Sequence, residues 1–182
     1  MLLFSSDRER RLWTWTLAVV VAIYSTLSLA RTLAGALRDS GLLEASFVLG
    51  LLLVGATIVT QGLKTRPGGS EIGVALGVAA TYLMVFVRMA IPEERTHLIE
   101  YGVVAIFIHE ALTERASQGR RVPVPALLAV LATALVGVLD ECIQAFLPSR
   151  VFDPSDILFN ILAGVMAVAA SVALGWARRR DE

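Results

Sequence analysis

The chain has 182 residues, of which 56% are hydrophobic and 18% are charged, and its mean hydropathy is +0.70. Soluble domains are about 45–50% apolar and about 25% charged. This composition excludes a disordered chain, a disulfide-stapled secreted domain with its several cysteines, and an ordinary soluble enzyme. Sixteen basic residues balance sixteen acidic ones, so we expect no nucleic-acid partner.

Six apolar segments follow one another, and each is long enough, or nearly so, for a membrane helix of about 20 residues. They are residues 12–30, 45–63, 72–91, 95–115, 122–139 and 157–177. The connections between them, such as residues 31–41, are short. We therefore predict one all-α domain over residues 1–182, a polytopic bundle of six transmembrane helices in contact with the lipid bilayer.

The fourth segment is the least apolar, because it contains His97, Glu100, His109 and Glu110. Whether residues 95–115 fully span the membrane stays open, and the alternative is a helix lying at the membrane surface. The group formed by Glu110, Glu114 and Arg115 is typical of a solvated helix end, so we interpret it as structural.

Charge counts orient the predicted bundle. Cytoplasmic segments of membrane proteins carry the excess of Lys and Arg. If the N-terminus lies inside, the inner segments hold eleven of the sixteen basic residues and the outer segments hold five. This bias predicts that both termini are cytoplasmic.

Small residues are spaced four apart in two of the segments, as Gly73 with Gly77 and Ser171 with Gly175. Such pairs allow close contact between helices, although chance spacing in a Gly- and Ala-rich segment is the alternative.

In this topology three segment ends meet at the outer face: the start of 95–115, the end of 122–139 and the start of 157–177. Ionisable groups in membrane segments are costly and usually functional, so we predict one shared polar site there. The alternative is scattered structure, with Ser155 or Asp156 capping the last helix. The candidate site residues are His97, Glu100, Tyr101, Asp140, Glu141, Gln144, Arg150, Asp153, Asp156 and Asn160.

Residues 140–164 resemble the signature of the VanZ-like family. The string DECIQAFLPSR at 140–150, then Asp153, Asp156, Asn160 and Gly164, is similar to D-E-x-x-Q-x-F-x-P-x-R followed by D-x-x-D-x-x-x-N-x-x-x-G. Residues 94–102, ERTHLIEYG, look like the family's second motif, built around a His and a Tyr. The resemblance covers about residues 93–175. It implies a multi-pass protein of the bacterial cytoplasmic (inner) membrane, in a family whose namesake is associated with resistance to the glycopeptide teicoplanin.

Three function classes stay open. In the first, a non-enzymatic envelope protein binds a lipid headgroup, a lipid-linked cell-wall precursor or a glycopeptide, and Arg150 contacts an anionic group. In the second, a membrane-embedded hydrolase or transferase acts on a lipid-linked substrate with paired carboxylates. Its catalytic candidates are His97, Glu100, Glu141 and Arg150. In the third, the chain is a structural subunit that binds other subunits of a membrane complex.

No cofactor is expected. A divalent metal ion would take its ligands from His97, Glu100, Glu141 and Asp156, but their spacing matches no recognised metal signature, so the predicted site is metal-free. Cys142 is expected to be a small packing residue.

Overall fold

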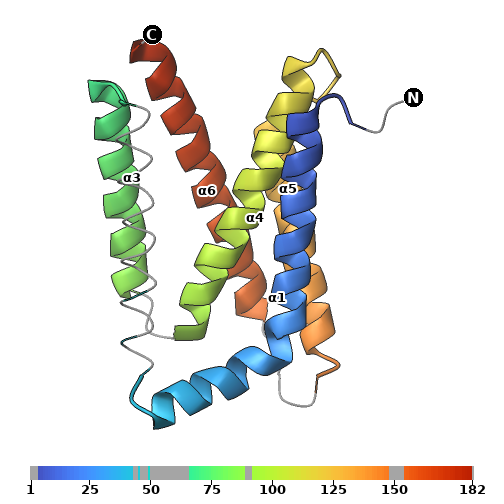
Figure 1. Ribbon diagram of the computed structural model, residues 1–182, viewed down its shortest axis with the longest axis vertical. Coiled ribbons are helices and arrows are strands. Elements are labelled where there is room, and N and C mark those ends of the chain that lie inside the picture. Colours follow the sequence, from blue (N-terminus) through green and yellow to red (C-terminus); the bar gives the residue numbers. More distant parts are fainter. Residues whose placement is uncertain are drawn as a thin grey trace.

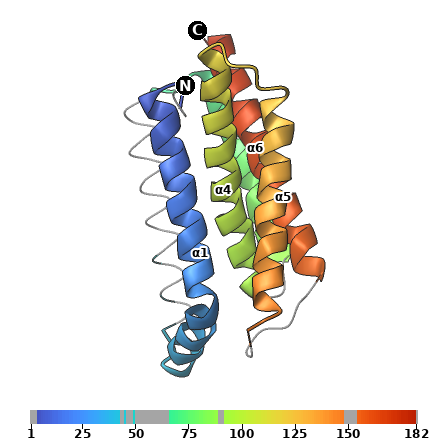
Figure 2. The same ribbon diagram turned by 90° about the vertical axis from the view of Figure 1, so that its right-hand side faces the viewer.

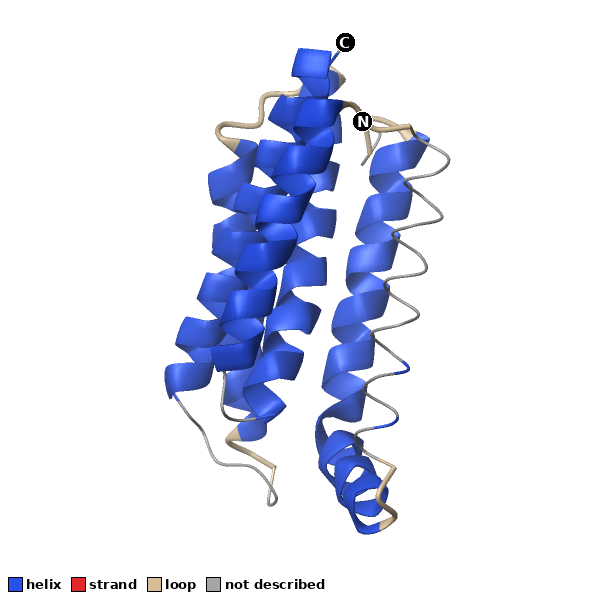
Figure 3. Cartoon of the chain, turned by 90° about the vertical axis from the view of Figure 1, so that its left-hand side faces the viewer, coloured by secondary structure: helices blue, strands red, loops and turns tan. Residues whose placement is uncertain are grey.

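A computed structural model describes residues 4–42, 45, 49, 66–88, 92–147 and 154–181. Every regular element in this part of the chain is an α-helix, as Figure 3 shows. The helices are α1 (Asp7–Asp39), α3 (Gly69–Arg88), α4 (Pro92–Ser117), α5 (Pro125–Gln144) and α6 (Pro154–Asp181). The predicted all-α class is confirmed. The predicted second span, residues 45–63, lies outside the described residues except for Ala45 and Leu49.

Helices α4, α5 and α6 pack against one another, and α6 also contacts α3 (Figure 1). Helix α1 lies along one side of this group, against α4 (Figure 2). The start of α1 and the end of α6 lie at the same end of the bundle. The opposite end collects the start of α4, the end of α5 and the start of α6, which are the three places that carry the predicted site.

Helix boundaries differ from the predicted spans at three points. Residues 31–41 were expected to connect two helices, but α1 continues to Asp39 and changes direction on the way (Figure 1). Helix α5 begins at Pro125 because proline is well suited to a first helical turn, and it continues to Gln144 rather than ending at residue 139. Helix α6 begins at Pro154, so Asp156 lies in its first turn and is not its N-cap residue.

Two of the described helices, α5 and α6, are long and apolar enough to cross a membrane. Helix α3 contributes a shorter apolar helix, Gly69–Val85. Length and composition are all that these helices show, and the membrane location stays a prediction. The six spans and the cytoplasmic termini stay predictions.

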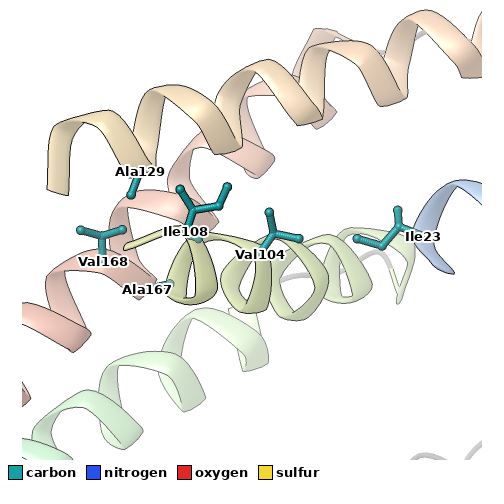
Figure 4. Close-up of a cluster of buried hydrophobic side chains, with 7 residues drawn as sticks. Ile23, Val104, Ile108, Ala129, Ala167 and Val168 are labelled. Atoms are coloured by element: carbon teal, nitrogen blue, oxygen red, sulfur yellow. The ribbon is translucent and has the colours of Figure 1, made fainter. Parts of the chain in front are cut away.

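The main core forms where α4, α5 and α6 meet, with one contribution from α1. Figure 4 shows its buried side chains. Alanines in this set let the helix axes approach closely, since they fill little space between the backbones. The buried residues of the cluster are Ile23, Val104, Ala105, Ile108, Ala129, Ala167 and Val168.

Close contacts between helices occur at Gly137 and Gly164. A Cβ atom built at Gly137 of α5 would lie 2.8 Å from the Asn160 Cβ of α6. One built at Gly164 of α6 would lie 3.3 Å from the Thr133 Cγ2 of α5. The approach of α5 to α6 therefore requires glycine at position 137, whereas a Cβ atom at position 164 would need the Thr133 side chain to shift by a few tenths of an ångström.

The glycine pair predicted for close helix contact behaves differently. No atom of the described residues lies within 4 Å of a Cβ atom built at Gly73 or Gly77, so these two positions face open space on α3. On α6, a Cβ atom at Gly175 would meet only the side chain of Arg179, which belongs to the same helix. The three glycines therefore make no close helix contact within the described chain, whereas Ser171 of α6 contacts α4, with its hydroxyl 3.1 Å from His109 Nδ1.

Ion pairs tie the first turn of α1 to the last turns of α4. The fully buried Glu9 carboxylate accepts hydrogen bonds from Arg115 at 2.9 Å and from the Ser5 amide at 2.6 Å. Arg8 pairs with Glu110 at 2.8 Å and Glu114 at 2.9 Å. These pairs agree with the interpretation of Glu110, Glu114 and Arg115 as a structural group, and α1 covers this helix end only in part, since Glu110 and Arg115 keep 35% and 37% of their side-chain surface.

Candidate functional site

Eight of the ten predicted site residues fall on three neighbouring helix ends. The sequence positions dictate this placement, since α5 descends to the end of the bundle from which α4 and α6 rise (Figure 1). The early turns of α4 carry His97, Glu100 and Tyr101; the last turns of α5 carry Asp140, Glu141 and Gln144; the first two turns of α6 carry Asp156 and Asn160.

Most of these polar side chains are buried inside the bundle rather than displayed on its outer surface. Tyr101, Asp140, Glu141 and Asn160 are 0% exposed, and Gln144 is 1% exposed. His97 is also buried, whereas Glu100 is half-buried and the Asp156 side chain keeps 23% of its surface. The site therefore lies within the helix ends, with Asp156 and Glu100 at its more accessible edge.

Two carboxylates of α5 share one amide donor. The Gln144 Nε2 atom donates to Asp140 Oδ2 at 3.1 Å and to Glu141 Oε1 at 3.3 Å. The spacing explains this, because residues three and four apart lie next to each other on a helix. The shared amide fixes both carboxylates within one turn.

On α4, His97 links the site to α6. Its Nε2 atom lies 3.9 Å from Asp156 Oδ2, and its ring stacks on Tyr101 with centroids 5.8 Å apart. The ring contact is made within α4, since Tyr101 lies one turn after His97.

Five buried side-chain atoms of the site make no hydrogen bond of normal geometry to any described residue, although the Tyr101 hydroxyl interacts with the Asp140 carboxylate. Burying such an atom unpaired costs about 1–3 kcal/mol. They come from four residues on three different helices, so they do not result from one misplaced side chain. The atoms are His97 Nδ1, Tyr101 Oη, Asp140 Oδ1, Asn160 Oδ1 and Asn160 Nδ2.

The sequence did not indicate a contribution from α1. The Tyr24 hydroxyl donates to the Val136 carbonyl at 2.8 Å, one turn before Asp140. The negative charge of Asp140 acts on the hydroxyls of both Tyr24 and Tyr101. Tyr24 lies in an apolar segment with no motif around it, so only the tertiary packing of α1 could reveal it.

The family model described as VanZ/LLP1 matches residues 72–175, which are 104 of the 182 residues. The chain belongs to the VanZ/LLP1 family. The resemblance read from residues 93–175 is confirmed, and the match also takes in α3 from residue 72 onward. No curated protein and no solved structure matches the chain.

The VanZ/LLP1 match covers every residue of the predicted site, including two that the structure does not describe. Arg150 and Asp153 lie outside the described residues, so their predicted contacts stay predictions. Cys142 is exposed on α5, which contradicts its expected role as a packing residue.

The metal variant receives no support from the described part of this VanZ/LLP1 protein. No group of three or more His, Cys, Asp or Glu side chains in the described ranges is placed to hold a metal ion. His97, Glu100, Glu141 and Asp156 accordingly do not assemble into a ligand set there.

Proposed function

We propose that this VanZ/LLP1 protein binds the polar headgroup of an envelope ligand in the cluster formed by α4, α5 and α6. The ligand is a lipid headgroup, a lipid-linked cell-wall precursor or a glycopeptide, and the role is tolerance to glycopeptides. The observation that carries the proposal is the set of five buried polar atoms that find no partner among the described residues.

A polar cluster that serves only as scaffold satisfies its own hydrogen bonds, because each buried unpaired group weakens the fold. This cluster instead keeps both kinds of group unused. Asn160 offers an unused donor, Nδ2, and an unused acceptor, Oδ1, whereas the Tyr101 hydroxyl and the Asp140 carboxylate act on each other. Sugar hydroxyls and peptide amides carry donors and acceptors side by side, so they match this set better than a simple anion does.

Two observations support the membrane setting of this proposal. Helices α5 and α6 have the length and apolar composition of membrane spans. Basic residues concentrate in the segments expected on the cytoplasmic side. With the termini at that side, the polar cluster belongs to the outer side of a bacterial inner membrane, where envelope ligands are found. We propose six spans in this arrangement.

A second candidate function is hydrolysis or group transfer on a lipid-linked substrate. It is favoured by the Asp140 and Glu141 carboxylates held on one amide. Neighbouring carboxylates in a buried site can divide the roles of acid and base. In this version Glu141 or Glu100 is the general base, His97 is the acid or orients it, and Arg150 stabilises developing negative charge.

The proposal is tested by measuring teicoplanin susceptibility in the native host with the gene deleted and then restored. We expect deletion to increase susceptibility, and wild type but neither Asp140→Asn nor Glu141→Gln to restore tolerance. Both substitutions remove a charge while nearly preserving shape. Cys142→Ser is the matched control on the same helix, because Cys142 is exposed.

Membrane abundance of each variant must be measured together with susceptibility. Loss of Asp140→Asn or Glu141→Gln protein from the membrane would assign the cluster to the scaffold instead. Unchanged susceptibility after deletion would refute the envelope role. Copurification with other proteins at a fixed ratio in mild detergent would instead favour the structural-subunit alternative.

A further inference from the structure

Three consecutive arginines near the end of α6 have different surroundings. The first, Arg178, donates to Glu71 Oε1 of α3 from its Nε atom at 3.1 Å and from its Nη2 atom at 2.6 Å. Beside this pair, the Asp181 carboxylate accepts hydrogen bonds from the Ser70 hydroxyl and the Glu71 amide at the start of α3. Arg178 and Asp181 therefore join α6 to α3 within the fold.

The next two arginines lie back along α6, against the preceding turn. The guanidinium carbon of Arg180 lies 4.1 Å from the centroid of the Trp176 ring. The Arg179 Nη1 atom lies 3.7 Å from the position that a Cβ atom would take at Gly175. Side chains on a helix tilt toward its N-terminus, which explains both directions. Because Gly175 and Trp176 are neighbours, the two guanidinium groups occupy adjacent positions of one turn.

Neither Arg179 nor Arg180 has an ion pair with a carboxylate of the described chain. The carboxylates described at this end of the bundle are already engaged by other groups. Two positive charges placed side by side repel each other, so an anion bound between them would stabilise the arrangement. Besides Asp181, the engaged carboxylates are Asp7 with Arg10, Glu9 with Arg115, Glu71 with Arg178, and Glu110 and Glu114 with Arg8.

Trp176 indicates what kind of anion these arginines would meet. It is 48% exposed, and exposed tryptophans of membrane proteins are enriched at the level of the lipid headgroups. It lies on α6, which is one of the two described helices long and apolar enough to cross a membrane. In the proposed membrane setting, the guanidinium groups beside Trp176 therefore lie at the level of lipid phosphates. A guanidinium binds phosphate through two parallel hydrogen bonds.

We propose that Arg179, Arg180 and Trp176 bind the phosphate-bearing headgroup of an anionic phospholipid. The Trp176 ring holds the Arg180 side chain in place, and the headgroup supplies the negative charge that no described carboxylate supplies. The proposal rests on the membrane setting of the proposed function but not on the ligand of the polar cluster, which lies at the opposite end of the bundle (Figure 1).

The experiment measures lipid binding to the purified full chain in detergent by native mass spectrometry. The probes are phosphatidylglycerol and phosphatidylcholine with the same acyl chains, and we expect phosphatidylglycerol to bind more tightly. One arginine near a membrane surface changes the binding of anionic lipid about fivefold, so Arg179→Gln and Arg180→Gln should each lower the preference about fivefold. Trp176→Leu should lower it too, but should have no further effect in a chain that already carries Arg180→Gln.

Two other arginines supply the controls. Arg10→Gln removes one positive charge at the same end of the bundle, from an exposed arginine that already has a carboxylate partner, and should not change the preference. Arg178→Gln should lower the melting temperature, because it breaks the pair with Glu71. Arg179→Gln and Arg180→Gln should leave the melting temperature unchanged, so their effect on lipid binding is not a loss of fold.

Equal binding of the two lipids would overturn the proposal. An equal loss of preference in Arg10→Gln would also overturn it, because the chain would then respond only to its overall charge. Displacement of phosphatidylglycerol by an equal concentration of inorganic phosphate would assign the two arginines to a soluble anion instead.

The polar cluster is tested independently of this lipid site. Asp140→Asn should leave phosphatidylglycerol binding unchanged, so a silent Asp140→Asn in the susceptibility assay refutes the cluster's ligand without touching the lipid site. Recovery of the chain in the soluble fraction of cells lysed without detergent would refute the membrane setting on which both proposals rest.

Discussion

Replacing Gly137 by alanine is expected to push α5 away from α6 at the candidate site. The added Cβ atom would lie 2.8 Å from the Asn160 Cβ and 3.0 Å from its Nδ2 atom. Carbon atoms in favourable contact are about 3.5–4.0 Å apart, so the two helices must separate by about 0.7 Å or more. The Asn160 Cβ is attached directly to the backbone and cannot rotate away, so the helix itself must move.

The energetic cost follows from two opposing terms. Overpacking of this kind costs about 1–3 kcal/mol. Alanine also stabilises a helix relative to glycine by about 0.8–1.0 kcal/mol. We therefore expect Gly137→Ala to be destabilised by up to about 2 kcal/mol, as the difference of these terms.

The assay is thermal unfolding of the purified protein in detergent, followed by tryptophan fluorescence, with Gly77→Ala as the control. Gly77 has no described atom within 4 Å of its missing Cβ, so its alanine variant gains helix stability without a clash. In the double variant Gly137→Ala with Asn160→Gly, removal of the opposing Cβ should relieve the clash. If Gly137→Ala is as stable as Gly77→Ala, the close contact between α5 and α6 described above does not exist.

Three further predictions concern the ion pairs and the core. Glu9→Gln should lower the free energy of unfolding by about 1–3 kcal/mol, because it leaves Arg115 without its charged partner. Thermal unfolding measures this loss. Arg11→Gln is the control and should have little effect, because Arg11 is exposed. Burial raises the pKa of Glu9, but hydrogen bonds from Ser5 and the charge of Arg115 outweigh it and lower that pKa. The resulting stabilisation is complete above pH 4.5, the ordinary pKa of a glutamate, and is lost as the pH falls through the lowered pKa of Glu9. If the melting temperature of Glu9→Gln fell with acid in the same way as that of the wild type, this prediction would be wrong. Ile108→Ala should lower the free energy of unfolding by about 2–5 kcal/mol, measured by thermal unfolding. Ile106→Ala should lower it far less, because Ile106 of the same helix is 38% exposed. Equal losses of stability in the two variants would mean that Ile108 is not a core residue.

The sequence predicted the helices and the meeting of three helix ends for a simple reason. Apolar length identifies a membrane helix locally, and alternating direction then determines which ends lie together. His97, Asp140 and Asn160 could therefore be grouped before their contacts were known. The motif spacing also placed Asp140 and Gln144 one turn apart, where the structure has their hydrogen bond.

The remaining contacts depend on how helices pack, which no local pattern encodes. Tyr24 reaches the turn before Asp140 only because α1 lies against α4 and α5. Small-residue spacing suggested Gly73 and Gly77 as helix contacts, yet the close approach of α5 to α6 is at Gly137, an isolated glycine in α5. The burial of Glu9 against Arg115 likewise joins two segments 106 residues apart.

The two ends of the bundle use their polar residues in opposite ways. At the end that holds the first turn of α1, Glu9 is matched by Arg115, and His109 lies 3.1 Å from the Ser171 hydroxyl. Among the described residues, Ser5 Oγ is the exception there. At the other end, five atoms of comparably buried side chains stay unmatched by any described residue. Because both ends belong to the same helices and could have been paired equally well, the unmatched end carries a cost that stability alone does not explain. A ligand that supplies the missing hydrogen bonds would recover that cost on binding, and therefore we infer that the binding site lies at this end.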